Sequence, residues 1–282
     1  MGEPTGPGMG SWVWDPTLYA GSAAYYADGR VPYPPALADA IAAGLGTDGT
    51  GRLLDVGCGP GSLTLLLAPL FAQIIGIDAD PDMVQVAGDR SAAAELWSVS
   101  CRQLRGEELP ADLGTFRAVT FAQSLHWMRR TEVLTAVSGM LRDGGACLHI
   151  RASTTRGIPT DVPLPHPEPP HDAIAALVGD YLGPARRAGL GVVPDELPDE
   201  RERPFLAAGF TDQQRVDVAG EVVARTADQL VAAVYSLSSS TPYLLGEQRP
   251  AFEADLRALL AEVSADGLFS EQLREITIDF WR

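Results

Sequence analysis

The sequence lacks lysine altogether, and its charge is strongly one-sided. All 21 basic side chains are arginines, against 37 acidic ones, so the 282 residues carry a formal net charge of −16 at pH 7. A nucleic-acid partner needs a basic face to neutralise its phosphates, so this balance argues against one. The charge agrees with a soluble protein that acts on a small neutral or cationic substrate, although a solvated acidic surface is the simpler explanation.

Long apolar runs and a disulfide framework are also absent. No segment reaches the roughly 18 consecutive apolar residues that span a bilayer, and the N-terminus shows no apolar signal segment. The three cysteines, Cys58, Cys101 and Cys147, are odd in number and widely spaced, which is typical of reduced, intracellular proteins. The histidines lack the cysteine or carboxylate spacing of a zinc site. We therefore expect a cytoplasmic protein with no metal and no membrane partner.

The clearest motif is a glycine-rich segment at residues 53–61, Leu-Leu-Asp-Val-Gly-Cys-Gly-Pro-Gly. An apolar run ends there in an acid, followed by three glycines at alternate positions, and a second apolar run, 74–77, ends in Asp78. This pattern predicts a strand, a glycine turn, a helix and a second strand that hold an adenosine-containing cofactor. Glycines permit the tight turn and let a ligand lie against bare backbone. The Asp78 carboxylate is placed to accept hydrogen bonds from both ribose hydroxyls.

Two details distinguish this turn from a nicotinamide-dinucleotide fingerprint. Gly61 comes one position early, and Ser62 stands where the dinucleotide pattern has its third glycine. Asp55 is acidic where a dinucleotide site usually has an apolar residue, and an acid suits a ligand with an ammonium and a sulfonium group. The chain resembles the class I S-adenosylmethionine-dependent methyltransferases, especially the small-molecule subgroup with a Tyr…Arg-x-Pro-Tyr-Pro segment before the turn and a His-Trp pair after it.

The resemblance implies how the first two strands would hold S-adenosylmethionine. Gly57, Gly59 and the backbone of Cys58 would contact the methionine half of the cofactor. Asp55 would bind the amino group, directly or through a water molecule, and Asp78 would bind the ribose. An ordinary strand-to-helix turn that binds nothing is the structural alternative.

The resemblance also assigns the adenine ring and its surroundings. Met83 would pack on one face of the adenine, and backbone groups of Gly106 and Glu107 would meet its edge. Because Arg105 replaces the family's usual aspartate there, a plain surface loop is the alternative.

An N-terminal segment resembles the part of the family that folds over the cofactor. Tyr26 and Arg30 precede the Pro-Tyr-Pro of residues 32–34, and Arg30 would pair with the cofactor carboxylate. A purely structural aromatic arm is the alternative. The complete set of predicted cofactor-binding residues is Tyr26, Arg30, Asp55, Gly57, Cys58, Gly59, Asp78, Ala79, Met83, Gly106, Glu107 and Gln123.

His126 is the candidate catalytic residue. It follows the fourth predicted strand, which the resemblance places nearest to the transferable methyl group, and histidine's ordinary pKa suits a general base. The alternative, that His126 only shapes the pocket, stays open because many methyl transfers need little help from a base. Holding nucleophile, methyl carbon and sulfur in line supplies up to roughly 7–11 kcal/mol of the barrier reduction.

The apolar patterns predict an α/β fold with a doubly wound, seven-stranded Rossmann-like sheet. The predicted strands are 52–56, 74–78, 98–103, 116–122, 146–152, 214–218 and 276–281. Helices are predicted at 35–45, from residues 62 and 81 onward, and at 131–141, 172–182, 203–208, 227–236 and 251–263. The resemblance adds that the last strand runs antiparallel between the fifth and the sixth.

We interpret the whole chain, 1–282, as a single methyltransferase domain. Residues 1–34 would form an arm or lid, and residues 35–152 the cofactor-binding half. The Pro-rich segment 153–200 is interpreted as an insertion that forms a lid. Residues 201–282 would complete the sheet and carry a helical insertion.

The function implied by the resemblance is transfer of a methyl group from S-adenosylmethionine to oxygen, nitrogen or carbon of a small molecule, by in-line substitution. One alternative is a protein that binds S-adenosylmethionine without transferring a methyl group. A less favoured alternative is a nicotinamide-dependent oxidoreductase on a similar sheet. No motif identifies the acceptor or the oligomeric state, for which a homodimer is one option.

Overall fold

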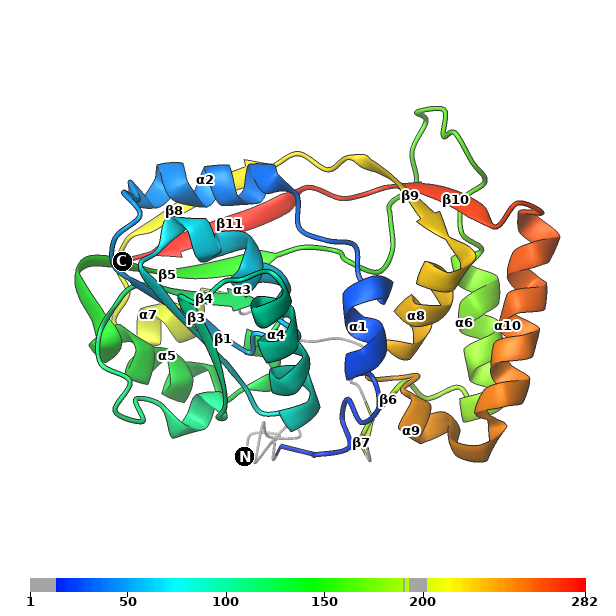
Figure 1. Cartoon of the computed structure of the whole chain (residues 1–282), viewed down its shortest axis with the longest axis horizontal. Helices are drawn as coiled ribbons and strands as arrows, with labels where there is room; N and C mark the ends of the chain where they lie inside the picture. The colour runs from blue at the N-terminus through cyan, green and yellow to red at the C-terminus, as the bar shows by residue number, and fades with distance from the viewer. Residues whose placement is uncertain (1–13, 190, 193–201) are drawn as a thin grey trace, which may run out of the picture.

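The core of the molecule is a seven-stranded sheet with helices on both faces (Figure 1). The computed structural model describes residues 14–189, 191–192 and 202–282. The strands of this sheet are β1 (Arg52–Val56), β2 (Gln73–Asp78), β3 (Val99–Gln103), β4 (Phe116–Ala122), β5 (Leu141–Arg151), β8 (Gln213–Val218) and β11 (Ile276–Trp281). They lie side by side in the order β3-β2-β1-β4-β5-β11-β8. The predicted fold class is therefore confirmed.

Strand direction explains where a ligand would bind on this sheet. Strands β1 to β5 are parallel, whereas β11 pairs antiparallel with β5 on one side and β8 on the other, as expected for the last strand. The strand order reverses between β1 and β4, because β2 and β3 extend to one side and β5 to the other. In open α/β sheets ligands bind outside the carboxyl ends of the strands at such a switch point.

Each face of the sheet has its own apolar core, because successive strand side chains point to opposite faces. The covering helices are α2 (Pro35–Leu45), α3 (Ser62–Leu67), α4 (Pro81–Ala93), α5 (Arg130–Met140) and α7 (Arg203–Ala207). Leu53 packs in the layer of α2 and α3, whereas its neighbour Leu54 packs in the layer of α5 and α7. The two-sided burial accounts for the continuous apolar runs of β1 and β2.

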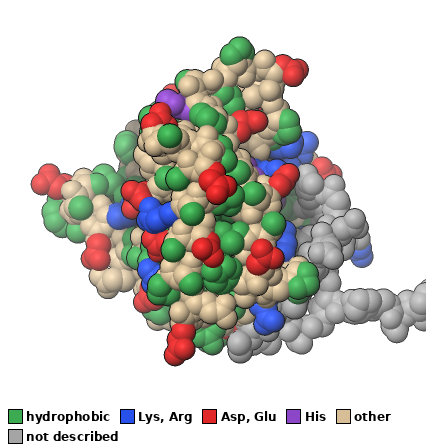
Figure 2. Space-filling view, turned by 90° about the vertical axis from the view of Figure 1, so that its right-hand side faces the viewer, with side chains coloured by type: hydrophobic (Ala, Val, Ile, Leu, Met, Phe, Trp, Pro, Cys, Tyr) green, Lys and Arg blue, Asp and Glu red, His purple; other side chains and the backbone are tan. Residues whose placement is uncertain are grey.

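A second group of elements, which we call the helical lobe, lies beside the carboxyl ends of the parallel strands (Figure 1). It consists of α1 (Ala23–Gly29), α6 (His171–Leu182), α8 (Ala227–Tyr235), α9 (Pro242–Leu245), α10 (Arg249–Val263) and a two-stranded sheet of β9 (Val222–Thr226) and β10 (Leu268–Gln272). The lobe has an apolar core that includes the buried rings of Tyr235, Phe252 and Phe269. Acidic side chains are scattered among hydrophobic ones on the face of the molecule shown in Figure 2.

The remaining described elements are short. A two-stranded hairpin pairs β6 (Arg187–Ala188) with β7 (Gly191–Val192), and single 3₁₀ turns occur at Ala68–Leu70, Gly106–Glu108, Leu125–Trp127 and Gly246–Gln248.

Several elements differ from the sequence prediction. Helix α1 forms within the predicted arm, and β5 begins at Leu141 instead of residue 146. Helix α9, the β6–β7 hairpin and the β9–β10 sheet have no predicted counterpart. The alternation of β9 and β10 is hidden in the sequence because their buried positions include the charged residues Arg225 and Glu271. A buried charge is compatible with a strand interior only when its partner is brought to it by the fold.

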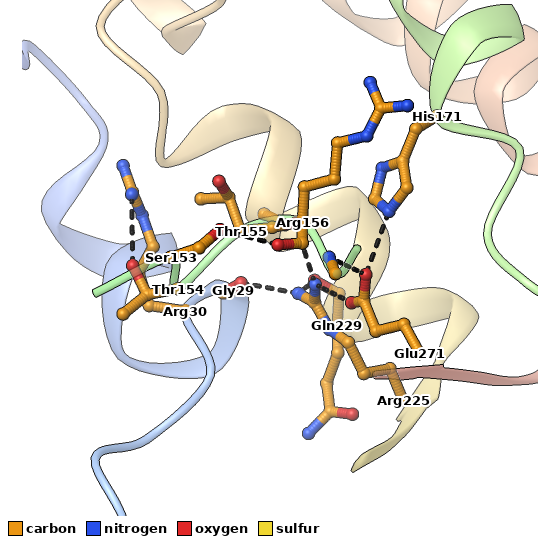
Figure 3. A network of polar contacts seen from close by, with 12 residues as sticks. Gly29, Arg30, Ser153, Thr154, Thr155, Arg156, His171, Arg225, Gln229 and Glu271 are labelled. Carbon is orange, nitrogen blue, oxygen red and sulfur yellow. Dashed lines mark hydrogen bonds and ion pairs between the residues drawn. The ribbon is translucent and has the colours of Figure 1, made fainter. Parts of the chain in front are cut away.

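Arg225 and Glu271 form a buried ion pair at the junction of the lobe with the sheet (Figure 3). Arg225 Nη1 lies 3.1 Å from Glu271 Oε1, and both side chains are less than 5% exposed. The guanidinium also donates to three carbonyl oxygens, those of Gly29, Thr155 and Gln229. One arginine thereby connects the end of α1, the segment that follows β5, and α8.

The other oxygen of Glu271 ties the start of the Pro-rich segment to the lobe. Glu271 Oε2 accepts a hydrogen bond from the Gly157 amide and lies 3.0 Å from His171 Nε2. Burial by itself would raise the pKa of Glu271, but the hydrogen bonds from His171, Gly157 and Arg225 lower it overall. Ile158, which follows Gly157, forms a β-bridge with Gln272 at the end of β10.

Candidate functional site

A cavity opens at the carboxyl ends of β1, β2 and β4, with about 680 Å³ of empty space that includes its open mouth. Its position is the switch point of the sheet, where open α/β folds bind their ligands. The predicted cofactor residues that line the cavity are Tyr26, Gly57, Gly59, Asp78, Ala79, Met83, Gly106, Glu107 and Gln123. The structure thus brings together residues from five separate segments of the chain around one space.

The glycine turn forms one wall of the cavity, and the reason for a glycine at position 57 differs from the reason at position 59. Gly57 has a left-handed φ of 71°, and a Cβ on it would lie 2.4 Å from Ser124 Cβ. Gly59 also has a left-handed φ, 54°, but a Cβ there would meet nothing within 4 Å. Gly57 is therefore required by packing inside the protein, whereas Gly59 leaves bare backbone facing open space that a ligand can occupy.

Asp78 ends β2 on the cavity wall with its carboxylate anchored at both oxygens. Oδ2 accepts a hydrogen bond of 2.8 Å from the Gly59 amide, and Oδ1 accepts one of 2.9 Å from the Asp80 amide. Burial raises the pKa of Asp78 to about 6, although these two hydrogen bonds act in the opposite direction. A carboxylate oxygen has more than one acceptor position, so ligand hydroxyls can still bind this group.

Asp55 lies behind the glycine turn and not on the cavity surface. Its side chain is 1% exposed, and its two oxygens accept hydrogen bonds from the Thr64 and Thr120 hydroxyls, at 2.6 and 2.8 Å. Burial raises the pKa of this carboxyl group. The direct contact with the cofactor amino group is therefore not available in this geometry, and the water-mediated contact stays a prediction.

Arg30 does not line the cavity either. Its guanidinium donates to the hydroxyl and the carbonyl oxygen of Ser236, both at 2.8 Å, and lies 4.5 Å from the centre of the Tyr26 ring. Arg30 thereby fastens α1 to the end of α8, which is the structural role considered as the alternative in the sequence analysis.

The cavity mouth is aromatic, and several of its residues are absent from the predicted set. Tyr19 packs edge-on against both Tyr26 and Trp127, with ring centres 6.4 and 6.1 Å apart. Tyr19 belongs to the aromatic-rich arm and Trp127 to the His-Trp pair, so both carried a signal in the sequence. The lining residues outside the predicted set are Trp14, Tyr19, Leu104, Arg105, Ala122, Ser124, Trp127 and Met128.

The arm, and not the Pro-rich segment, covers this cavity in the described part of the chain. Trp14, Tyr19 and Tyr26 line it, whereas none of residues 153–189 does. The predicted arm lies partly outside the described residues, because these begin at residue 14, and so does the end of the 153–200 segment.

The region assigned to the adenine edge is closely packed. A Cβ on Gly106 would lie 2.8 Å from Met128 Sδ, so this position excludes a side chain. Glu107 lines the cavity, and its carboxylate accepts a hydrogen bond of 2.9 Å from the Arg129 amide. Met83 is 3% exposed and also lines the cavity.

His126 lies next to the cavity but does not line it. Its ring centre is 4.8 Å from that of Trp127, and the residue is exposed. Surrounding protein atoms desolvate the ring, and with the nearby charge of Arg130 they lower the pKa of His126 to about 4. The imidazole is therefore neutral at pH 7 and can accept a proton, but it is a weak base.

Among residues 14–189, 191–192 and 202–282, no group of three or more His, Cys, Asp or Glu side chains is arranged to hold a metal ion. In the same part of the chain, no helix has the length and apolar character needed to cross a bilayer.

A doubly wound sheet whose last strand is antiparallel, with a glycine turn and a strand-end acid at its switch point, defines the Rossmann-like methyltransferase class of fold. The YcgJ protein of Bacillus subtilis shares it with a TM-score of 0.51 and 18% identity over 87% of this chain and 97% of that one. A solved [4+2]-cyclase, SpnF, shares it with a TM-score of 0.51 and 19% identity over 96% and 98% of the two chains.

Part of this chain is similar in sequence to methyltransferases. Residues 53–145 match a family model described as a methyltransferase domain. An uncharacterized methyltransferase of Mycobacterium bovis is 32% identical over 132 residues, which cover 46% of this chain and 51% of the relative. A ubiquinone biosynthesis O-methyltransferase of Xanthomonas axonopodis is 38% identical over 96 residues, 33% of this chain and 40% of the relative. The chain thus spans about half or less of the curated relatives it matches.

Proposed function

We propose that the protein transfers a methyl group from S-adenosylmethionine to oxygen, nitrogen or carbon of a small-molecule acceptor. The observation that carries the proposal is the cavity at the switch point, where the bare backbone of Gly59 faces the open space beside the Asp78 carboxylate. The match of residues 53–145 to a methyltransferase domain supports it. A neutral or cationic acceptor suits the acidic chain, and we infer a cytoplasmic location from its free cysteines.

The residues present fit the cofactor in the proposed arrangement. Gly57, Gly59 and the Cys58 backbone would hold the methionine half, and Asp78 would accept hydrogen bonds from the ribose hydroxyls. The exposed backbone at Gly59 and the remaining acceptor positions of Asp78 are the groups that such a ligand requires. When bound, S-adenosylmethionine supplies a methyl group on a positively charged sulfur.

The adenine ring would lie between Met83 and the Gly106–Glu107 backbone. Because Glu107 uses its carboxylate to hold the Arg129 amide, the adenine edge would be met by backbone groups. Ala79 follows Asp78 on the cavity wall, and Gln123 donates to the Ala152 carbonyl oxygen at 2.6 Å, which fixes the end of β5 beside β4.

The acceptor would enter past Tyr19, Tyr26 and Trp127. These rings exclude water from the mouth and orient the acceptor against the methyl group, and positioning of this kind lowers the barrier substantially. The His126 ring lies against that of Trp127, where it would hold the Trp127 ring in place or take up the acceptor's proton.

Two measurements test the proposal. Calorimetry with S-adenosylmethionine, its demethylated product and a nicotinamide dinucleotide should show binding of the first two only. Binding of the dinucleotide alone would contradict the proposal. Because the fold is shared with a [4+2]-cyclase, binding does not establish transfer. Turnover with candidate acceptors must therefore yield the demethylated product, and its absence with every acceptor that binds would favour a binding protein without methyl transfer.

A further inference from the structure

Two thiols meet behind the glycine turn, at a position where the neighbouring strand has no side chain. Gly76 lies in β2, and a Cβ built on it would be 3.0 Å from Cys58 Sγ and 3.5 Å from Cys101 Sγ. Gly76 pairs with Cys101 in the adjacent strand β3. The two sulfur atoms therefore fill the space that a side chain at position 76 would occupy.

The two cysteines differ in access and acidity. Cys58 is 7% exposed within the glycine turn, whereas Cys101 is partly exposed on β3, the edge strand of the sheet. A hydrogen bond from the Cys58 thiol lowers the pKa of Cys101, and the Ser91 hydroxyl acts in the same direction. A partly exposed thiol with increased thiolate character is the form that reacts with peroxides.

We propose that Cys58 and Cys101 are an oxidation site that switches off cofactor binding, in which hydrogen peroxide converts the two thiols into a disulfide between the glycine turn and β3. The Cys101 thiolate attacks the peroxide, the O–O bond breaks, and Cys101 sulfenic acid and one water are formed. The Cys58 thiol then attacks the Cys101 sulfur, the S–S bond forms, and a second water leaves. The thiols lose two electrons and two protons, and hydrogen peroxide is reduced to water.

The disulfide would act on the cofactor site through the backbone of the turn. The Gly57 and Cys58 amides both donate to the Ile77 carbonyl oxygen, at 2.8 and 3.0 Å, and the Gly59 amide holds Asp78. An S–S bond is about 2.05 Å long and fixes the geometry of both cysteines, so a disulfide across Gly76 would tie the turn to β3 and disturb these contacts. Only this consequence for cofactor binding rests on the proposed function.

The experiment oxidises the full-length protein with hydrogen peroxide and compares two matched variants, Cys101→Ala and Cys147→Ala. Cys147 is fully buried in β5, and burial raises the pKa of its thiol, so it serves as the unreactive control. Peptide mapping should find a Cys58–Cys101 cross-link in the parent protein and in Cys147→Ala. Affinity for S-adenosylmethionine should fall at least about tenfold in both and return on reduction.

Cys101→Ala should bind S-adenosylmethionine like the reduced parent protein before and after peroxide. The absence of the cross-linked peptide, or an equal loss of affinity in oxidised Cys101→Ala, would overturn the proposal. Circular dichroism checks that each variant is folded, and Cys101→Ser replaces Cys101→Ala should the latter unfold. If the reduced parent protein binds no S-adenosylmethionine, the proposed function fails, whereas the peptide map still decides whether the thiol pair is an oxidation site.

Discussion

The sheet and the helical lobe build their polar interiors in different ways. In the sheet, the cavity wall consists of backbone turns and strand ends contributed mainly by residues 53–145. In the lobe, Arg225 and Glu271 bind segments that are far apart in the chain, including α1, α6 and the stretch after β5. A ligand site made of local turns can be recognised from a motif, whereas a junction made of distant segments cannot.

The largest effect on stability is expected at the Arg225–Glu271 ion pair, where the helical lobe meets the sheet. We expect Glu271→Ala to lower the free energy of unfolding by about 3–5 kcal/mol, because it leaves the buried Arg225 charge unpaired. Asp172→Ala is the matched control, since Asp172 is paired with Arg156 but its side chain is 93% exposed. Asp172→Ala should lower the free energy of unfolding, measured with urea, by less than about 1 kcal/mol. Equal losses in the two variants would mean that the buried pair does not hold the lobe to the sheet.

The second-largest effect is expected at Asp78 in the cavity. It should lower the affinity for the cofactor and leave the stability of the protein nearly unchanged. Asp78→Ala should weaken S-adenosylmethionine binding by roughly 2–3 kcal/mol, because charge-assisted hydrogen bonds to the ribose are lost. Asp82→Ala, an exposed acid in the first turn of α4, is the control for a simple change of charge. Calorimetry and thermal unfolding on the same samples distinguish a ligand-binding role of Asp78 from a structural one. A variant that unfolds yet keeps its affinity would identify Asp78 as a structural acid.

The pH dependence of S-adenosylmethionine binding tests the role of the Asp78 carboxylate. Burial raises its pKa from 3.8 to about 6, so the free protein takes up a proton here as the pH falls through 6. Ribose hydroxyls bind best to the ionised form, so affinity should fall by roughly tenfold between pH 7 and pH 5. Asp78→Asn should bind weakly and without this dependence between the two pH values. A parent protein with constant affinity over the same interval would show that the proton does not compete with the ligand.

The smallest effect is expected at His126, which lies outside the cavity lining. His126→Ala should leave cofactor affinity unchanged and lower turnover by less than about tenfold, since a base whose pKa is about 4 gains little by accepting a proton at pH 7. The pH profile between 6 and 8 should keep its shape. A loss of about 10²–10⁴-fold, with the acidic limb of the profile removed, would instead identify His126 as the general base.

Some residues of the site can be placed from the sequence, whereas others are placed only by the fold. The motif at residues 53–61 predicted the turn, the strands around it and the cavity wall, because Gly57, Gly59 and Asp78 act through local backbone geometry. The same reasoning could not place Asp55 or Arg30. Their residue types allow either a ligand contact or an internal hydrogen bond, and only the positions of Thr64, Thr120 and Ser236 favour the second.

The sequence by itself determined the order of strands and helices along residues 35–152, since periodicity and turn residues act over short distances. Only the tertiary structure decided which distant groups meet. It paired Arg225 with Glu271, set Cys58 beside Cys101 over Gly76, and laid the arm rather than the Pro-rich segment on the described cavity. The physical reason is that a buried charge or thiol gains its partner from strand register and helix packing, which no local pattern encodes.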